Sequence, residues 1–335
     1  MHALRNRLRR LVASFAGRRV LALGDMVADE YILGRPVRLS REAPLPVLEW
    51  VDRYIVPGGA ANVARNVGSL GASVAVAGVI GRDEPGQALR QRLEAAGIDT
   101  AGIIEEEGRP TSSKTRIIGG SPQVVSQQLA RIDRVVRTAL LAQTQARLLD
   151  YLQSALPRFD AMILSDYENG VIGADVIGVA LPLARQHGLT IVVDAHGGFE
   201  RFAGITVATP NQDEAALAVG RELHTDDEVR QAGHDLLRLM DARGVLITRG
   251  GEGMTVVEAD GPCHHLPATS PSEVRDVTGA GDTVAAAATL ALATGASLLE
   301  AAHLGNLAAG LVIRRLGTAT VACAEVLTAI EASNC

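Results

Sequence analysis

Asp282 ends the stretch D-V-T-G-A-G-D, and an apolar helix is expected directly after it, over residues 283–292. Gly279, Ala280 and Gly281 would expose backbone N–H groups at the positive end of this helix, a favourable place for an anion. A carboxylate beside such an anion site suits a base that takes the proton from a hydroxyl attacking phosphorus. A glycine-rich turn with an acidic N-terminal cap is the alternative interpretation.

Two further groups of residues are candidates for binding hydroxyl groups. Asp25 and Asp29 follow the first expected strand, and ligands of open α/β sheets sit beyond the carboxyl ends of strands. Two carboxylates there could hold the vicinal hydroxyls of a sugar. Gly58 and Gly59 allow the backbone to approach a ligand closely, and Asn62 offers both a donor and an acceptor. Surface acids and a tight lead-in to a helix are the alternatives.

Residues in the second half of the chain suggest a metal and a nucleotide. Asn211 and Glu214 are three residues apart and would share one helix face. Their oxygens suit Mg²⁺ held mainly through water, although a helix N-terminus with acids near its dipole is the alternative. Thr248, Gly250 and Gly253 lie in a glycine loop after the last expected strand. This loop is a candidate contact for nucleotide phosphates, and a hairpin turn would explain it as well.

Short apolar runs alternate with helical patterns along most of the chain. The runs are continuously apolar, as expected of parallel strands covered on both faces. Their alternation with helices predicts an α/β fold with a doubly wound, mostly parallel sheet. The expected strands are residues 20–24, 74–79, 161–165, 190–194 and 245–248, and the expected helices are residues 59–70, 85–96, 143–156, 175–187, 226–243, 279–294 and 298–316.

Two stretches interrupt this alternation. Residues 45–56 and 114–132 have strand-like composition, and no helix separates them from their neighbours. They predict a small β lid inserted in the main domain, with strands from about 36–57 and 109–133; edge strands of the main sheet are the alternative. We expect one main domain over residues 18–335.

Composition excludes several classes of protein. The 335 residues carry a net charge of −6 and only 3% aromatic residues, which argues against nucleic-acid binding as the main task. Cys263, Cys323 and Cys335 form no disulfide framework or metal motif, and no apolar run is long enough for a membrane span. Residues 1–17 are expected to form a basic, solvated N-terminal extension rather than a membrane-surface helix. A cytoplasmic protein without stable membrane insertion is expected.

The glycine motifs resemble those of a known family. Residues 58–81 and 276–282 are similar, position by position, to the two signatures of PfkB or ribokinase-like carbohydrate kinases. The resemblance covers residues 18–330 and implies a ribokinase-like kinase domain that uses ATP and Mg²⁺, with a monovalent cation such as K⁺ as a further candidate. It implies Asp282 as the base, the amides of residues 279–281 as the anion hole, and Asn306 beside the adenine. Ordinary helix packing is the alternative for Asn306.

Within that family, residues 39–47 (LSREAPLPV) resemble a segment of the kinases that phosphorylate heptose 7-phosphate at C1 for lipopolysaccharide precursor synthesis. The implied substrate is D-glycero-D-manno-heptose 7-phosphate. Its phosphate would meet Arg116 and Lys114, the only lysine among 32 basic residues. The chain departs from these kinases at Asn169, where they usually have lysine, and at Ala195-His196, where they usually have Pro-Lys.

Alternative functions belong to different classes. A sugar or nucleoside kinase with an unphosphorylated substrate would lack positive side chains in the lid, and a non-catalytic sugar-phosphate sensor would not turn over ATP. A dinucleotide-dependent oxidoreductase would need G-x-G-x-x-G after the first strand, which Gly24-Asp25-Met26 does not supply. The expected partners are a small sugar or sugar phosphate and, because an exposed strand edge invites pairing, a second copy of the chain bound through the lid.

Overall fold

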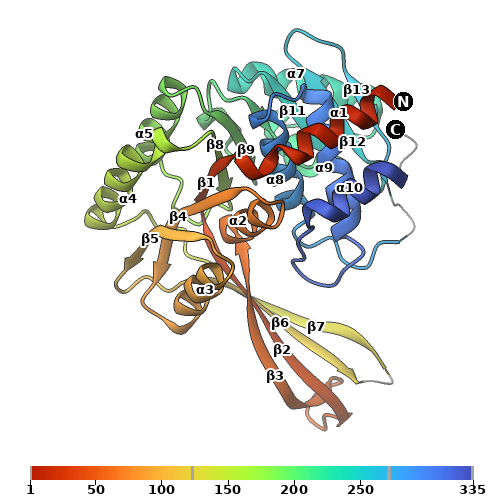
Figure 1. Ribbon diagram of the computed structural model, residues 1–335. Coiled ribbons are helices and arrows are strands. Elements are labelled where there is room, and N and C mark those ends of the chain that lie inside the picture. The colour runs from red at the N-terminus through yellow and green to blue at the C-terminus, as the bar shows by residue number, and fades with distance from the viewer. Residues whose placement is uncertain (1, 122–123, 270–272, 333–335) are drawn as a thin grey trace.

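A nine-stranded sheet runs through the centre of the protein, shown by a computed structural model that describes residues 2–121, 124–269 and 273–332 (Figure 1). The strand order is β13-β12-β11-β10-β9-β8-β1-β4-β5, and only the pairs made by β12 are antiparallel. This confirms the predicted doubly wound α/β class. Four strands were not predicted, namely β5, β10, β12 and β13. The strands are β1 (Arg19–Gly24), β4 (Ser73–Gly81), β5 (Asp99–Glu106), β8 (Ala161–Asp166), β9 (Thr190–Ala195), β10 (Val207–Ala208), β11 (Gly244–Thr248), β12 (Met254–Glu258) and β13 (His264–Leu266).

Helices cover both faces of this sheet. In β1, Val20 and Ala22 point into one apolar core, and Leu21 and Leu23 point into the other, which is why this run is apolar throughout. The first core is closed by α1 (His2–Ala13), α2 (Ala60–Ser69), α3 (Glu84–Ala95), α8 (Ala280–Ala293), α9 (Leu298–Val312) and α10 (Cys323–Ala332). The second is closed by α4 (Ala142–Ala155), α5 (Ala174–Gln186), α6 (Gln212–Val219) and α7 (Asp226–Met240).

The direction of winding reverses between β1 and β8. From β1 the chain proceeds through β4 to β5 on one side, and from β8 it proceeds through β9 and β10 to β11 on the other. The segments that follow β1 and β8 therefore lie side by side, and the N–H of Asp25 donates to the carbonyl of Ser165 at 3.1 Å. Ligands of open α/β sheets bind at such a reversal, beyond the carboxyl ends of the strands.

A separate four-stranded sheet projects from this edge (Figure 1). Its order is β3-β2-β6-β7, with β2 and β6 parallel and the outer pairs antiparallel. It is the predicted lid, but it begins about ten residues earlier than expected because β2 continues the chain directly after Asp25. The strands are β2 (Met26–Leu39), β3 (Pro46–Gly59), β6 (Ser112–Ser121) and β7 (Val124–Arg134); residues 122–123 of the expected lid lie outside the described residues.

Helix α1 is packed against the main domain, unlike the solvated extension expected from its arginines. Leu8, Leu11 and Val12 are each at most 2% exposed and join the first core. Phe15, in the short 3-10 turn after the helix, is 1% exposed. Arg7 pairs with Glu300 of α9 at 3.3 Å. The helix therefore forms one unit with the sheet and its covering helices.

Two further expectations concern thiols and membranes. Cys263 and Cys323 are free thiols, and Cys335 lies outside the described residues. In the part of the chain that the structure describes, no helix is both long enough and apolar enough to cross a bilayer.

The packing of the N-terminal segment leads to a stability prediction. Phe15→Ala should lower the free energy of unfolding by about 3–5 kcal/mol, because it removes a buried aromatic ring and leaves a cavity. Arg10→Ala, at an exposed position of α1, should change it by less than about 0.5 kcal/mol. Urea unfolding followed by circular dichroism measures both. Equal midpoints for the two variants would show that this segment does not stabilise the domain.

Candidate active site

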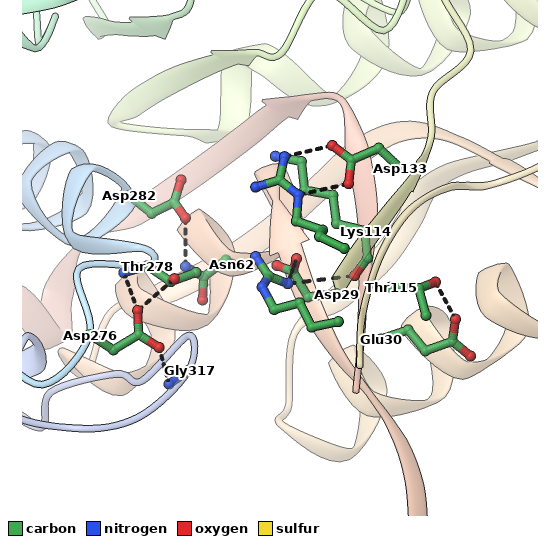
Figure 2. Close-up of polar contacts among 12 residues, drawn as sticks. Asp29, Glu30, Asn62, Lys114, Thr115, Asp133, Asp276, Thr278, Asp282 and Gly317 are labelled. Atoms are coloured by element: carbon green, nitrogen blue, oxygen red, sulfur yellow. Dashed lines mark hydrogen bonds and ion pairs between the residues drawn. The ribbon is translucent and has the colours of Figure 1, made fainter. Parts of the chain in front are cut away.

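Asp282 lies in the first turn of α8 and is only 3% exposed. One carboxylate oxygen, Oδ2, accepts a hydrogen bond from Nδ2 of Asn62 in α2 at 2.6 Å, and Figure 2 shows the two side chains pointing toward each other. The other oxygen, Oδ1, accepts from the hydroxyl of Tyr167 at 3.2 Å. Two neutral donors therefore hold a buried carboxylate at the N-terminus of a helix.

The environment of Asp282 suits proton transfer. Burial raises the pKa of this carboxyl to about 6, while the hydrogen bonds from Asn62 and Tyr167 limit the rise. A general base is most effective when its pKa lies near the working pH. Asp282 therefore remains mostly ionised at neutral pH and is more basic than an exposed aspartate.

The backbone before Asp282 supplies part of the predicted anion site. Gly279 has a φ of +79°, and a Cβ there would lie 2.7 Å from Nδ2 of Asn62, so only glycine fits. Among the described residues, the N–H groups of Gly279 and Gly281 have no hydrogen-bond partner, whereas that of Ala280 donates to the carbonyl of Val277 at 3.1 Å. The predicted set of three free amides is thus corrected to two, because Ala280 closes a tight turn.

Asp276 fixes the loop that carries these amides. It accepts hydrogen bonds from the N–H and hydroxyl of Thr278 and from the N–H of Gly317 (Figure 2). Burial favours the neutral acid, but these donors outweigh it and lower the pKa of Asp276. A charged Asp276 therefore ties residues 276–279 to the segment after α9.

Asp29 and Arg116 form a buried ion pair at the base of the lid. Nη1 of Arg116, on β6, lies 2.6 Å from Oδ1 of Asp29, on β2. A Cβ at Gly58 would lie 2.3 Å from Oδ2 of Asp29, so the glycine leaves room for this carboxylate. Gly59, the next residue, has a φ of +58° and leads into α2. The predicted residues Asp29, Gly58, Gly59 and Arg116 are therefore brought together.

Asn62 and Lys114 contribute polar groups on the two sides of the site. Oδ1 of Asn62 is buried and has no partner among the described residues, so this amide keeps an acceptor for a ligand hydroxyl. Lys114 is half-buried on β6, and its Nζ lies 4.6 Å from the centroid of the Tyr167 ring. No carboxylate of the described chain lies within ion-pair distance of it, and burial lowers the pKa of its amine.

Asp25 has a structural task rather than the predicted contact with a sugar. It is fully buried, and its oxygens accept hydrogen bonds from the N–H groups of Tyr167, Asn169 and Val171 at 2.8, 3.0 and 3.2 Å. Burial raises the pKa of this carboxyl to about 6. Because the backbone occupies both oxygens, Asp25 is removed from the predicted substrate-binding set. It instead positions the loop after β8.

Asn211 and Glu214 form a capping box at the start of α6. This arrangement matches the alternative to a metal site, a helix N-terminus with acids near its dipole. Oε2 of Glu214 accepts from the N–H of Asn211 at 2.8 Å, and its Oε1 contacts Nδ1 of His196. No group of three or more acidic, histidine or cysteine side chains in the described residues is arranged to hold a metal ion. These residues fit Mg²⁺ only as partners of its water shell.

Asp194 is a third carboxylate at the carboxyl edge of the sheet, near Asp282 and Glu214, and favours a cation there. It lies at the end of β9, where Thr209 donates to it at 3.0 Å. Burial, followed by the charges of Asp282 and Glu214, raises the pKa of Asp194 to about 7. Three carboxylates therefore repel one another across the edge of the sheet.

The nucleotide candidates lie along one side of the molecule. Thr248 and Gly253 frame a hairpin between β11 and β12, with Gly250 at a φ of +53°. A Cβ at Gly253 would lie 2.0 Å from the carbonyl oxygen of Leu266, so the hairpin touches the segment after β13. Asn306, in α9, donates to the carbonyl of Pro267 in that segment at 2.8 Å. Asn306, Leu266 and Pro267 line a groove of about 920 Å³.

Two polar residues of the site were not predicted. Tyr167 and Asp194 were not chosen as site residues, although Asn169 and the strand over residues 190–194 were identified. Only their positions indicated a role, because Tyr167 follows β8 and Asp194 lies at the end of β9, both at the carboxyl edge of the sheet. Nothing in the local sequence distinguishes Tyr167 from its neighbours, since its role arises from contacts with residues distant in the chain.

The chain is similar to known proteins over most of its length. The chain is 39% identical to the bifunctional protein HldE of Citrifermentans bemidjiense, covering 96% of this chain and 66% of that protein. It is 43% identical to the HldE of Caulobacter vibrioides, covering 97% and 66%. The chain thus spans slightly less than two thirds of the length of these relatives.

Solved structures show the same fold. Arabidopsis thaliana ribokinase, complexed with ribose and ATP, superimposes with a TM-score of 0.73 at 17% identity, over 94% of this chain and 99% of that one. Phosphofructokinase-2 from Escherichia coli, in complex with substrates and products, gives 0.75 at 21%, over 94% and 98%. The fold is therefore ribokinase-like, as the motifs implied. Residues 51–324 match the pfkB family of carbohydrate kinases, and the chain belongs to this family.

Proposed function

We propose that this protein transfers the γ-phosphoryl group of ATP to the C1 hydroxyl of D-glycero-D-manno-heptose 7-phosphate. The observation that carries the proposal is the buried carboxylate of Asp282, with its pKa of about 6, next to the free amides of Gly279 and Gly281. Membership of a carbohydrate kinase family and 39–43% identity to HldE proteins support the sugar phosphate as acceptor.

Asp282 acts as the base in this reaction. Its carboxylate takes the proton of the attacking hydroxyl, the hydroxyl oxygen bonds to the γ-phosphorus, and the bond to the β-phosphate oxygen breaks to release ADP. The N–H groups of Gly279 and Gly281 donate to the oxygens of the transferred phosphoryl group, where charge must be stabilised. The oxygen of Asn62 that lacks a partner accepts from a sugar hydroxyl.

The lid holds the acceptor. Lys114 has no ion-pair partner among the described residues, interacts electrostatically with Asp282 and is the candidate partner of the substrate phosphate. Arg116 is neutralised by Asp29 and contributes less positive charge than the sequence suggested. Asn169 and His196 replace lysines of the heptose kinases. Because these two positive charges are missing, the second candidate for the acceptor is a sugar that carries no phosphate at the end opposite C1.

ATP would lie along the C-terminal half, with its phosphates near Thr248, Gly250 and Gly253 and its base in the groove beside Asn306. Mg²⁺ would be held through water by Asn211 and Glu214 and would shield the phosphate charges. A monovalent cation such as K⁺ remains a further candidate cofactor, since phosphofructokinase-2 from Escherichia coli has been solved in complex with potassium.

The lid is also the proposed interface of a homodimer. Trp50 and Val51 are adjacent on β3 and point to opposite faces, yet they are 70% and 54% exposed. Leu39 and Ile132 are also largely exposed, at 72% and 60%. Several large apolar side chains exposed on one small sheet are typical of a contact surface. Phosphofructokinase-2 from Escherichia coli has a tetrameric inhibited form.

The role of Asp282 is tested by Asp282→Asn, which preserves shape but cannot accept a proton. We expect turnover with ATP and the heptose phosphate to fall by about 10² or more, while the unfolding midpoint stays close to that of the parent. Asp150→Asn, at an exposed position of α4, is the matched control and should keep full turnover. Near-normal turnover of Asp282→Asn in an ADP-release assay would exclude Asp282 as the base.

The role of Lys114 is tested by Lys114→Ala. Loss of a charged partner for the substrate phosphate should raise KM for the heptose phosphate about tenfold or more, with KM for ATP within about twofold. Arg38→Ala, at an exposed position near the end of the lid strand β2, is the control. An unchanged KM for the phosphorylated sugar would favour an acceptor without a phosphate.

The proposed dimer is tested by Trp50→Glu. A charge in place of an exposed aromatic side chain of the lid should convert a dimer into a monomer, measured as molar mass by light scattering during gel filtration. Leu217→Glu places the same charge at an equally exposed apolar residue of α6, 72% exposed, and should leave the mass unchanged. A parent protein that is already a monomer would overturn the proposed interface.

A further inference from the structure

Tyr167 lies in the candidate active site but has no role in the proposed mechanism. It follows β8, and its N–H donates to the buried carboxylate of Asp25 at 2.8 Å. The next residue, Glu168, has a φ of +57°, which is unusual for a residue other than glycine. The loop is therefore held in a specific conformation rather than merely connecting two elements.

The Tyr167 side chain contacts three other parts of the molecule. Its hydroxyl donates to Oδ1 of Asp282 at 3.2 Å. One side of the ring faces Nζ of Lys114 in the lid, 4.6 Å from the ring centroid. The ring also meets His196, which follows β9, edge to face at 4.3 Å between centroids. One residue thus links the base, the lid and the edge of the sheet near Glu214.

The direction of the hydrogen bond is fixed. Burial, followed by the charge of Asp282, raises the pKa of Tyr167 well above its usual value. The phenol therefore stays protonated and donates to the carboxylate, which favours the ionised form of Asp282. It also restrains rotation of the carboxylate, since Asn62 holds the other oxygen.

The contact between the Tyr167 ring and Lys114 helps to position the lid. Lys114 has no carboxylate partner among the described residues, and burial lowers the pKa of its amine. An ammonium over an aromatic face gains a favourable interaction that increases as water is excluded. The ring thereby gives the lysine a defined position when no substrate phosphate is bound.

We propose that Tyr167 is a positioning residue that couples the lid to the base: its hydroxyl orients Asp282, and its ring places Lys114 over the site. The proposal rests on the proposed function, because it gives Asp282 the role of base. The charged and titratable groups around this pair come from several elements: Asp29 of β2, Lys114 of β6, Asp194 of β9, His196 after β9, and Glu214 of α6.

Two substitutions separate the hydroxyl contact of Tyr167 from the contacts of its ring. Tyr167→Phe removes only the hydroxyl, so kcat should fall about three- to tenfold with little change in KM. Because a donor that favours the carboxylate is lost, the acidic limb of the kcat profile should shift to higher pH. Tyr167→Leu also removes the ring, so KM for the heptose phosphate should rise about threefold or more. Tyr151→Phe, in α4 away from the site, is the matched control and should change none of these.

A double-variant cycle shows whether the hydroxyl acts through Asp282. In an Asp282→Asn background, Tyr167→Phe should cause no further loss of kcat, since the base that it orients is absent. An unchanged kcat and an unshifted acidic limb in Tyr167→Phe would overturn the proposal. So would equal losses in the two backgrounds, or an unchanged KM in Tyr167→Leu. Full activity of Asp282→Asn alone would instead overturn the proposed function.

Discussion

The structure depends on keeping one aspartate charged while it is almost fully buried. Removing a carboxylate from water is costly unless hydrogen bonds compensate it, and Asp282 obtains two, from Asn62 and Tyr167. The N-terminus of α8 adds the favourable field of a helix dipole. These partners are distant in sequence, since Asn62 and Asp282 are 220 positions apart. The doubly wound sheet brings them together, because the elements that carry them meet where its winding reverses.

A second layer of buried polar contacts holds these partners in place. Asp25 fixes the loop of Tyr167 through three backbone N–H groups. Arg109 extends this network to the lid by donating to the carbonyl of Asn169 at 2.7 Å while paired with Glu106 at 3.3 Å. Such networks are rigid only when every member has a partner. The strand β6 that carries Lys114 therefore starts close to the loop that carries Tyr167.

The sequence predicted the parts of the molecule that depend on local pattern. Continuous apolar runs located the central strands, and the glycines around Asn62 and before Asp282 indicated the candidate site. Prediction failed where partners decide the role of a residue. Asp25 and Asp29 are four residues apart and chemically alike, but one meets backbone N–H groups and the other meets Arg116. The five arginines before Arg19 suggested a solvated helix, whereas the apolar face of α1 packs on α10.

The central claim is that this site phosphorylates a sugar phosphate at its anomeric hydroxyl. It is tested most directly by incubating the protein with ATP, Mg²⁺ and D-glycero-D-manno-heptose 7-phosphate and following the products by ³¹P NMR. The account predicts equal amounts of ADP and of a new phosphate ester coupled to the C1 proton, with the 7-phosphate signal retained. ADP formed without that ester, or an equally fast reaction of the heptose that lacks the 7-phosphate, would contradict it.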